Sequence, residues 1–567
     1  MRVHYAELKQ VRADLTAPSA QFEVVTVEAG GHMVRTYRHA PPTLRAFWLS
    51  TAAFGDREYL VYEDDRYTYR EAHVLSASIA NWLHTKGIKS GDRVAIAMRN
   101  YPEWLLIYWA CVSIGIAVVG LNAWWVVEEL EYALKDSAPK AIFADAERLG
   151  QLASKPGMTD GIHVVAVRTE PMHRGVIAWR DVISAQSTMP DATIDPNDDA
   201  CTFYTSGTTG RPKGAQLTHR SCTTHILSML YAALSQSTAL ARATGVAPPP
   251  PAPPVALIAT PFFHVTATNC GAHAATAMGG KLVTMYKWEP AHALHLIERE
   301  RVTSLSTVPT MAREMLLHPN FAEHDTSSVV SLGGGGAALQ PDLVEKIEVR
   351  GKGARAATGY GLTETSGIIT SVSGDFFVAK PESCGVIMPC FEAKCVGEDG
   401  KDVARGSIGE LWVKSAQIVK GYLNKPEATA EAITDGWFHT GDVAWIDEDD
   451  FVFLVDRKKD MVLRGGENVY CAEVEAALYQ PPAVAECCVM GVADERLGEE
   501  VGAVIVLRDG FEASAHDLRA EAAKHVARHK LPRYYWISRE PLPRNATGKF
   551  IKRQLRDSLK PADAVQV

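Results

Sequence analysis

The segment YTSGTTGRPKG, Tyr204–Gly214, decides the fold and most of the chemistry of this chain. It follows Ala200–Phe203, a run that is typical of the end of a buried strand. Its glycines let backbone N–H groups approach an anion closely, and Lys213 adds a mobile positive charge. The other donors of the loop come from Thr205, Ser206, Gly207, Thr208, Thr209 and Gly210. The segment therefore predicts a binding loop for a polyphosphate.

This loop differs from the usual P-loop of nucleotide-binding proteins. The G-x-x-x-x-G-K-[ST] spacing is absent, and Pro212 precedes Lys213. The alternative is a solvated loop rich in glycine and threonine that binds nothing. The length and regularity of the pattern favour the phosphate site.

Four further motifs follow in the sequence. They are YGLTET at Tyr360–Thr365, WFHTGD at Trp437–Asp442, DRKKD at Asp456–Asp460 and NATGK at Asn545–Lys549. With the loop, these motifs resemble those of the adenylate-forming superfamily, which contains acyl-CoA synthetases, aryl-CoA ligases, luciferases and adenylation domains. The resemblance runs from about Thr43 to Leu555. Within the superfamily, the chain is most like the fatty acyl-CoA ligases.

The resemblance implies an α/β fold with two domains. We expect a large N-terminal adenylation domain of several subdomains at residues 1–456 and a small, mobile α+β domain at 457–567. The pivot between them would lie near Lys459, where many relatives carry aspartate. The implied reaction uses ATP, Mg²⁺ and coenzyme A, because a carboxylate must first become an acyl adenylate before a thiol can displace AMP.

The resemblance also implies roles for single residues around the nucleotide. Glu364 would bind Mg²⁺, a cation that prefers hard oxygen ligands, and Thr363 would contact the α-phosphate. Asp442 and Arg457 would hold the ribose. Tyr360 would pack against the adenine, and the backbone of Gly335, Gly336, Ala337 and Ala338 would line its other side. Gly361 would be a further nucleotide-binding residue.

The resemblance also implies residues that act in one half-reaction or the other, adenylation or thioester formation. Lys549 would bridge the substrate carboxylate and the α-phosphate during adenylation, as Lys213 steadies the other phosphates. After rotation, Gly465 and Gly466 would approach the pantetheine arm of coenzyme A, because adjacent glycines leave room for it. The predicted catalytic residues are Lys549, Thr363, Glu364 and Lys213.

The acid-binding pocket is predicted from fewer residues. His264, Val265 and Gly335 match segments that line it in the family, with a structural histidine as the alternative for His264. No aspartate lies between Pro261 and Cys270, which argues against α-amino acids. The glycines at 333–336 remove side-chain volume and favour a long or bulky hydrophobic acid, most plausibly a medium- or long-chain fatty acid. The alternatives are an aryl-acid CoA ligase, a fatty acyl-AMP ligase and a non-catalytic acyl-binding or transport protein.

Composition excludes several other classes. The net charge of −9 and the lack of a long basic run argue against nucleic acid as a partner. The ten cysteines form no C-x-x-C pair, which fits reduced thiols and a cytoplasmic location. The uncharged segment Trp104–Leu121 imitates a membrane span, but Gly115 and Gly120 favour a buried helix followed by a buried strand. We expect no secretory signal; a homodimer and a peripheral membrane association stay open.

Apolar runs alternate with helical stretches along the chain, which is typical of α/β layering. Strands are expected at 92–98, 141–144, 255–259, 281–285 and 451–455, and a helix at 128–134. In the C-terminal part we expect helices at 472–478 and 515–528 and strands at 484–490 and 502–507. The proline-rich stretch Gly245–Pro254 is expected to be a surface loop, because proline lacks an amide donor.

Overall fold

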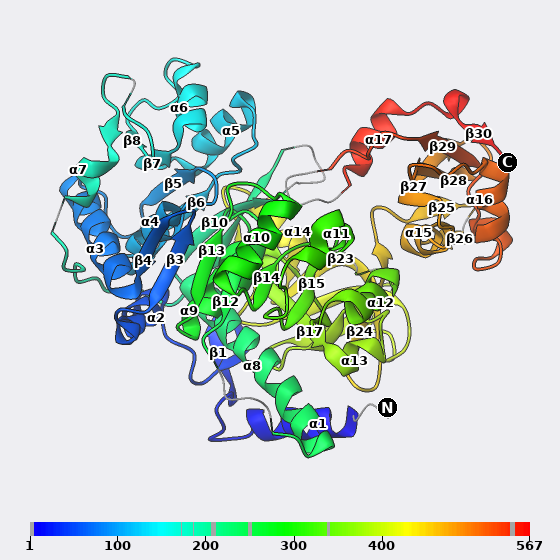
Figure 1. Cartoon of the computed structure of the whole chain (residues 1–567), viewed down its shortest axis with the longest axis horizontal. Coiled ribbons are helices and arrows are strands. Elements are labelled where there is room, and N and C mark those ends of the chain that lie inside the picture. The colour runs from blue at the N-terminus through cyan, green and yellow to red at the C-terminus, as the bar shows by residue number, and fades with distance from the viewer. Residues whose placement is uncertain are drawn as a thin grey trace. The chain divides into compact units, whose positions relative to one another are not determined.

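The computed structural model describes residues 5–171, 173–184, 186–205, 211–247, 252–336, 339, 341–465, 467–544 and 550–567. The chain divides into two compact units (Figure 1). The first contains Met1–Glu392 and Val413–Phe438, and the second contains Ala393–Trp412 and His439–Val567. The boundary predicted at residue 456 stays a prediction.

The first unit contains an eight-stranded sheet that is parallel over most of its width. The antiparallel strands are at one edge, where β11 pairs with β10 and β21. In order, the strands are β21 (Gly421–Tyr422), β11 (Lys213–Thr218), β10 (Asp199–Thr205), β6 (Ala117–Gly120), β5 (Arg93–Ala97), β7 (Ala141–Ala144), β8 (His163–Ala166) and β9 (Ile177–Ala178). Ligands of such sheets bind beyond the carboxyl ends of the parallel strands.

A five-stranded sheet of the first unit is parallel except for its last pair. Its strands are β14 (Ser304–Ser306), β12 (Val255–Ile258), β13 (Lys281–Thr284), β3 (Glu58–Tyr62) and β4 (Asp65–Thr68). Further strands are β1 (Val24–Ala29) with β2 (His32–Tyr37), β15 (Ser331–Gly335), β16 (Arg355–Leu362), β17 (Gly367–Ser373), β18 (Gly385–Ile387) and β22 (Ile433–Thr434).

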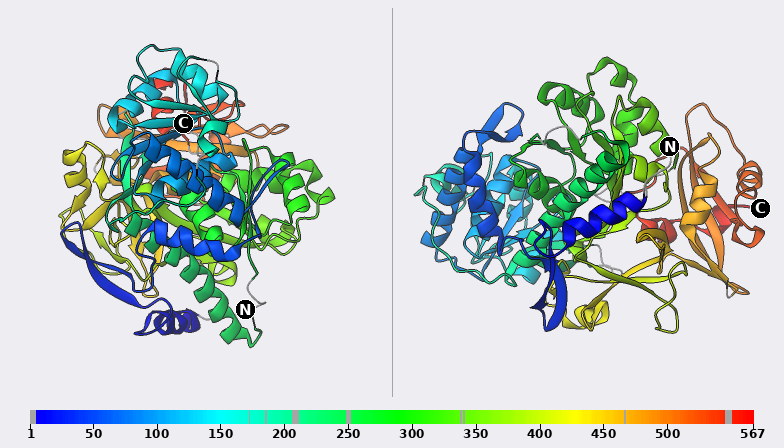
Figure 2. Two further views of the ribbon diagram at one scale, coloured as in Figure 1. Left: turned by 90° about the vertical axis from the view of Figure 1, so that its left-hand side faces the viewer. Right: turned by 90° about the horizontal axis from the view of Figure 1, so that it is seen from below.

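Helices pack around these sheets. They are α1 (Tyr5–Thr16), α2 (Leu44–Ser50), α3 (Tyr69–Thr85), α4 (Pro102–Ser113), α5 (Val127–Ser137), α6 (Ala146–Ala153), α7 (Trp179–Ile183), α8 (His219–Thr244), α9 (Ala274–Ala277), α10 (Pro290–Glu300), α11 (Pro309–Leu317), α12 (Pro341–Arg350), α13 (Gly374–Val378) and α14 (Pro426–Ala432). The long α8 lies beside α1 (Figure 2). Arg242 of α8 pairs with Asp14 of α1 at 2.7 Å.

The apolar segment Trp104–Leu121 confirms the predicted buried helix and strand, α4 and β6. Every residue of both elements is buried, because α4 lies inside the unit and β6 is a central strand. Among the described residues, none of the helices has the length and apolar character needed to cross a membrane. All ten cysteines are free.

The second unit has two groups of strands. One consists of β19 (Glu392–Val396), β20 (Gly409–Lys414), β23 (Trp437–Ile446) and β24 (Phe451–Arg457). The other is a six-stranded sheet of β25 (Val462–Arg464), β26 (Glu467–Val469), β27 (Val484–Asp494), β28 (Gly498–Leu507), β29 (Tyr534–Ser538) and β30 (Val565–Gln566). Its helices are α15 (Cys471–Leu478), α16 (Ala515–Ala522) and α17 (Lys552–Ser558).

The predicted strands and the helix at 128–134 are confirmed within a few residues, but the helix predicted at 515–528 is too long. α16 ends at Ala522, and the chain then turns so that Val526 and Leu531 both pack into the core of the second unit. Tertiary packing of these two side chains overrides the helical propensity of the intervening residues.

Candidate active site

The base of the predicted phosphate loop is a pair of antiparallel strands. Thr205 at the end of β10 faces Lys213 at the start of β11, and the Thr205 hydroxyl donates to the Lys213 carbonyl at 3.4 Å. The loop residues Ser206, Gly207, Thr208, Thr209 and Gly210 lie outside the described residues. The strand β6 lies parallel to β10, so the loop leaves the sheet at a carboxyl edge, where α/β proteins bind their ligands.

A second predicted residue, Glu364, lies in a tight turn after β16. The Thr365 hydroxyl donates to the Gly367 carbonyl at 2.7 Å and accepts the Leu362 N–H at 2.9 Å. Thr363 begins the short helix η4 (Thr363–Thr365) inside this turn. The backbone of Glu364 is held as well, because its carbonyl accepts the Val419 N–H at 2.9 Å. The carboxylate therefore projects from a fixed backbone.

Tyr422 joins these two predicted segments. Its hydroxyl donates to Glu364 Oε1 at 2.8 Å, and the Lys213 ammonium lies 4.9 Å from the centre of its ring. Burial and the neighbouring Glu364 carboxylate raise the pKa of Tyr422 far above its ordinary value, so the hydroxyl keeps its proton and donates. The strand β21 delivers Tyr422 here by pairing with β11. A cation over the ring and a carboxylate at the hydroxyl thus contact one phenol, an arrangement suited to a phosphate and its counterion.

Sequence reasoning missed Tyr422. The residue belongs to a two-residue strand, and its partners lie more than 50 residues away along the chain, because the Tyr422–Glu364 hydrogen bond spans 58 residues. A two-residue Gly-Tyr segment carries no periodicity that predicts a sheet position.

Of the residues predicted around the adenine, Tyr360 and Gly361 lie on β16, and Gly336 directly follows β15. Tyr360 is 8% exposed and pairs with Thr370 of β17. A Cβ at Gly361 would lie 1.9 Å from the Gly367 carbonyl oxygen, so the strand needs glycine at this bulge. Gly336 has φ +85°, which favours glycine, whereas Ala337 and Ala338 lie outside the described residues. The roles of these residues toward a base stay predictions.

The glycine run at 333–336 has a structural reason that the sequence did not reveal. A Cβ at Gly333 would lie 1.9 Å from the Ala357 carbonyl oxygen, and one at Gly334 would lie 2.4 Å from the Thr307 carbonyl oxygen. At Gly335 the nearest atom, the Gly359 carbonyl oxygen, is 3.3 Å away. Gly333 and Gly334 therefore allow close packing of backbone against backbone, and neither supports the inference of a large acid pocket.

The predicted acid-binding motif follows β12. His264 is half-buried, its ring lies 5.0 Å from that of Phe263, and Val265 is 8% exposed. The chain then forms a π-helix, η2 (Thr266–His273), an element that is frequent at functional sites. From this helix, the buried Asn269 side chain donates to the Ser366 carbonyl at 2.8 Å. Asn269, also missed by sequence reasoning, thus connects the acid motif to the turn that carries Glu364.

In the second unit, strand pairing brings Asp442 and Arg457 together. They face each other across β23 and β24, and Arg457 Nε lies 2.6 Å from Asp442 Oδ1. Asp442 is 4% exposed, and its N–H donates to the Thr440 hydroxyl at 3.1 Å. The two residues predicted to hold the ribose therefore form one site, with acceptor oxygens beside a guanidinium.

The predicted pivot lies in the turn after β24. Lys459 is exposed, and the turn is closed by the Asp460 N–H, which donates to the Arg457 carbonyl at 2.9 Å. Beside it, Asp456 accepts the N–H groups of Arg457 and Cys471. Burial raises the pKa of Asp456 to about 6, against the opposing effect of the Lys552 charge.

Gly465 lies in the turn between β25 and β26. Arg464 pairs with Glu467, which leaves two residues for the turn, and Gly465 has φ +59°. Such two-residue hairpin turns require positive φ and favour glycine. The turn alone therefore explains Gly465, and an approach by pantetheine stays a prediction. Gly466 and Lys549 lie outside the described residues.

Comparison with known proteins identifies relatives over nearly the whole chain. The family model of the AMP-binding enzymes matches residues 47–423, and that of the AMP-binding enzyme C-terminal domain matches residues 473–549. A feruloyl-CoA synthase of Amycolatopsis sp. is 35% identical, over 86% of this chain and 93% of the relative. A long-chain-fatty-acid–CoA ligase of Bacillus subtilis is 30% identical, over 89% of this chain and 92% of the relative.

The fold is similar to that of a solved ligase. The o-succinylbenzoate coenzyme A synthetase of Bacillus subtilis, in complex with ATP and magnesium, has a TM-score of 0.76 at 28% identity. The similarity covers 90% of this chain and 99% of that structure.

We predict that Gly333→Ala destabilises the protein strongly, because its Cβ would overlap the Ala357 carbonyl oxygen. Overpacking of this kind typically costs about 1 to 3 kcal/mol or more. Gly150→Ala is the matched control: Gly150 lies in α6 with nothing within 4 Å of its Cβ position, and alanine favours helix. Thermal unfolding measures both variants. Equal melting temperatures for Gly333→Ala and the parent would contradict the packing role.

The raised pKa of Asp456 predicts a pH dependence of stability. Between its ordinary value of 3.8 and about 6, the folded protein keeps a proton that the unfolded chain has lost. Stability from this group is therefore present at low pH and is lost as pH rises through about 6. We expect the melting temperature of the parent to fall relative to that of Asp456→Asn over this window, by the equivalent of about 1 to 3 kcal/mol. Parallel profiles would show that Asp456 is ionised throughout.

Proposed function

The chain belongs to the AMP-binding enzyme family, and we propose that it is an ATP-dependent carboxylate–CoA ligase for a hydrophobic carboxylic acid. The contact of Tyr422 with both Glu364 and Lys213 carries this proposal, because it places a cation and a carboxylate together at the base of the phosphate loop. The relatives named as CoA ligases support the same reaction class.

The reaction has two steps. A carboxylate oxygen of the acid attacks the α-phosphorus of ATP, the bond to the β-phosphate breaks, and pyrophosphate leaves. The thiolate of coenzyme A then attacks the acyl carbonyl carbon, and AMP leaves. The first step brings two anions together, so preorganised positive charge and hydrogen-bond donors are needed where negative charge develops.

The residues of the first unit fit the binding of ATP with Mg²⁺. Glu364 would hold the cation with one carboxylate oxygen while Tyr422 fixes the other. Mg²⁺ is commonly bound by one or two carboxylates together with substrate phosphates, and Glu364 would be such a ligand. Bound Mg²⁺ supplies charge neutralisation, and Lys213 would add to it.

The residues of the second unit would hold the sugar and neutralise the charge of the attacking carboxylate. Asp442 and Arg457, paired at 2.6 Å, would share their hydrogen-bonding capacity with the ribose hydroxyls. Lys549, assigned from its motif, would neutralise the attacking carboxylate during adenylation. Lys459 would be the pivot for the change to thioester formation.

We propose a medium- or long-chain fatty acid as the substrate, in line with the fatty-acid ligase among the relatives. An aryl acid is the second candidate, because a feruloyl-CoA synthase is 35% identical over 86% of the chain. The strand packing of Gly333 and Gly334 removes part of the argument for a large pocket. In either case, His264, Val265 and Gly335 would line the acid-binding pocket.

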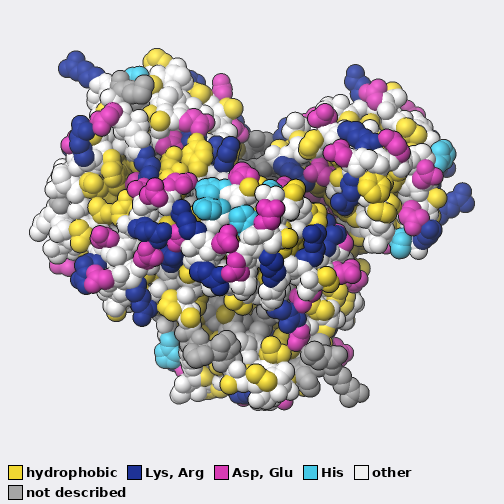
Figure 3. All heavy atoms as spheres, viewed as in Figure 1, with side chains coloured by type: hydrophobic (Ala, Val, Ile, Leu, Met, Phe, Trp, Pro, Cys, Tyr) yellow, Lys and Arg dark blue, Asp and Glu magenta, His cyan; other side chains and the backbone are white. Residues whose placement is uncertain are grey.

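Surface charge and thiol state support a small-molecule enzyme of the cytoplasm. On the face drawn in Figure 3, Lys and Arg side chains are interspersed with Asp and Glu among the described residues, without the continuous basic surface of a nucleic-acid-binding protein. Ten free cysteines fit a reducing compartment.

A substrate screen tests the proposal. The protein is incubated with ATP, Mg²⁺ and coenzyme A and with fatty acids of increasing length or with cinnamic, benzoic and amino acids, and the products are read by mass spectrometry. We expect an acyl-CoA and AMP from fatty acids. Aryl thioesters alone would support the second candidate, acyl-AMP without thioester would identify an acyl-AMP ligase, and no ATP–pyrophosphate exchange with any acid would identify a non-catalytic protein.

The Tyr422 contact predicts a metal phenotype. Tyr422→Phe removes the donor that orients Glu364, and loss of such a supporting bond typically costs about 10- to 100-fold in metal affinity or activity. We expect a higher Mg²⁺ requirement in pyrophosphate exchange, and a still higher one for Glu364→Gln. Tyr37→Phe, which removes another buried hydroxyl contact 3.2 Å from Ser228, is the control. An unchanged Mg²⁺ titration of Glu364→Gln would show that another group holds the cation.

A further inference from the structure

The segment 545–549, which ends at Lys549, begins and ends at one place in the second unit. On its two sides, Arg544 and Phe550 form an antiparallel bridge, and the Ile551 N–H donates to the Pro543 carbonyl at 2.9 Å. The Arg544 guanidinium also lies 4.3 Å from the centre of the Phe550 ring. The described residues that flank the segment are therefore joined to each other by backbone pairing and by a cation–ring contact.

The stretch that enters the segment is fastened to β27 by Glu486. One carboxylate oxygen of Glu486 accepts the Leu542 N–H at 2.7 Å, and the other pairs with Arg544 at 2.6 Å. Leu542 is itself buried, in a cluster with Cys488 and Met490 of the same strand. A single side chain thus holds both the backbone and the last charged residue before the segment.

The stretch that leaves the segment is fastened to the same strand by Lys552. The Lys552 ammonium donates to the Val489 carbonyl at 2.9 Å and to Glu475 Oε1 at 3.0 Å. Glu475 Oε1 also accepts the Val489 N–H at 2.8 Å, so helix, strand and lysine meet at one carboxylate. Burial alone would lower the pKa of Lys552, but the Glu475 charge raises it, so the lysine remains charged.

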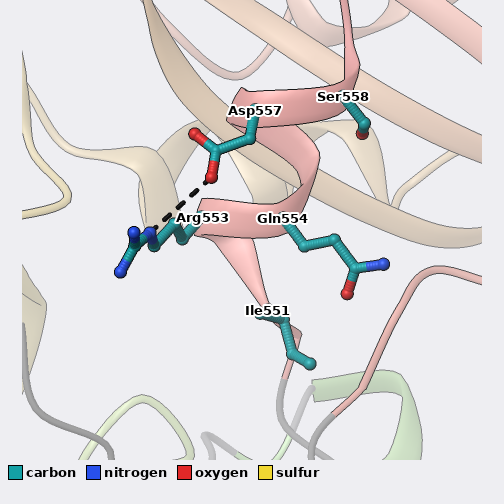
Figure 4. Close-up of a pocket in the computed structure, with 5 residues that line it drawn as sticks. All are labelled: Ile551, Arg553, Gln554, Asp557 and Ser558. Carbon is teal, nitrogen blue, oxygen red and sulfur yellow. Dashed lines mark ion pairs between the residues drawn. The ribbon is translucent and has the colours of Figure 1, made fainter. Parts of the chain in front are cut away.

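Lys552, the first residue of α17, is much less exposed than the residue that follows it. Its side chain is 19% exposed, whereas that of the neighbouring Arg553 is 69% exposed and lies 3.6 Å from Asp557 beside a surface pocket (Figure 4). A buried ion pair contributes little net stability compared with apolar residues of similar size, because desolvation of both charges offsets their attraction. The bonds from Lys552 to a strand carbonyl and a helix carboxylate are directional, however, and they fix the start of α17 relative to β27 and α15.

We infer that Glu486 and Lys552 are positioning residues for Lys549 in the adenylation step. This inference rests on the proposed role of Lys549. Both anchors hold the ends of its segment on β27, one before and one after, so release of either would let the ammonium move. Misplacement of a reacting group by about 1 Å can cost about 100-fold in rate.

Half-reaction kinetics of Glu486→Gln and Lys552→Met test the inference. We expect ATP–pyrophosphate exchange to fall about tenfold or more through kcat, with the KM for ATP unchanged, while thioester formation from supplied acyl-AMP stays at the parent rate. Lys552→Arg, which keeps the charge, should recover part of the exchange. Arg539→Met is the matched control, because Arg539 pairs with Glu512 at 2.6 Å just before Leu542 without bonding to β27.

A double substitution separates positioning from a general loss of structure. In Lys549→Ala, no lysine remains to be positioned, so adding Glu486→Gln should lower exchange no further, whereas independent defects would multiply. Equal losses in both half-reactions, or multiplying losses, would overturn the inference. If Lys549→Ala itself exchanges at the parent rate, the proposed function of Lys549 is wrong; if only the anchor variants do, the anchors alone are refuted. Should Lys552→Met fail to fold, Glu486→Gln decides.

Discussion

The hydrogen bond from Tyr422 to Glu364 holds together the site proposed for ATP and Mg²⁺ in the first unit. Glu364 has its backbone fixed by Val419 and its carboxylate fixed by Tyr422, whose ring also receives the Lys213 ammonium. The segments that carry Lys213, Glu364 and Tyr422 thereby meet at one phenol, although they lie far apart in the sequence. Because the hydroxyl is buried and keeps its proton, it can only donate to the carboxylate, which fixes the direction of the bond.

Backbone crowding is the second constraint, and it changes how the glycines of the motifs should be understood. At Gly333, Gly334 and Gly361 a Cβ would collide with a carbonyl oxygen of a neighbouring segment. At Gly367 it would collide with the ring of His225. These glycines let neighbouring backbone segments, and at Gly367 a buried ring, approach each other closely. Glycines in such a motif therefore allow close packing of the protein backbone, in addition to any room that they leave for a ligand.

The sequence predicted the fold well where one segment carries its own pattern. The strands at 141–144 and 281–285 and the buried stretch Trp104–Leu121 follow from runs of apolar residues that central parallel strands and buried helices require. It predicted Asp442 beside Arg457 only through the resemblance, and the register of β23 and β24 explains the contact. Tyr422 and Asn269 could not be predicted, because each acts on a turn that lies far away in the chain, and α16 is short because of distant core packing.

In the second unit, helix α15 connects the predicted pivot to the lysine segment. Cys471 at its start donates its N–H to Asp456, and Glu475, one turn later, receives Lys552. The first bond is made by the backbone at the start of α15 and the second by a side chain on the next turn, so this one helix joins Asp456 to Lys552. Asp456 precedes the proposed pivot Lys459 and Cys471 follows it, so a rotation there would act directly on the bond between Asp456 and α15. These bonds keep charged groups inside the unit, which costs free energy of desolvation. The proposed positioning of Lys549 would explain why the unit keeps them.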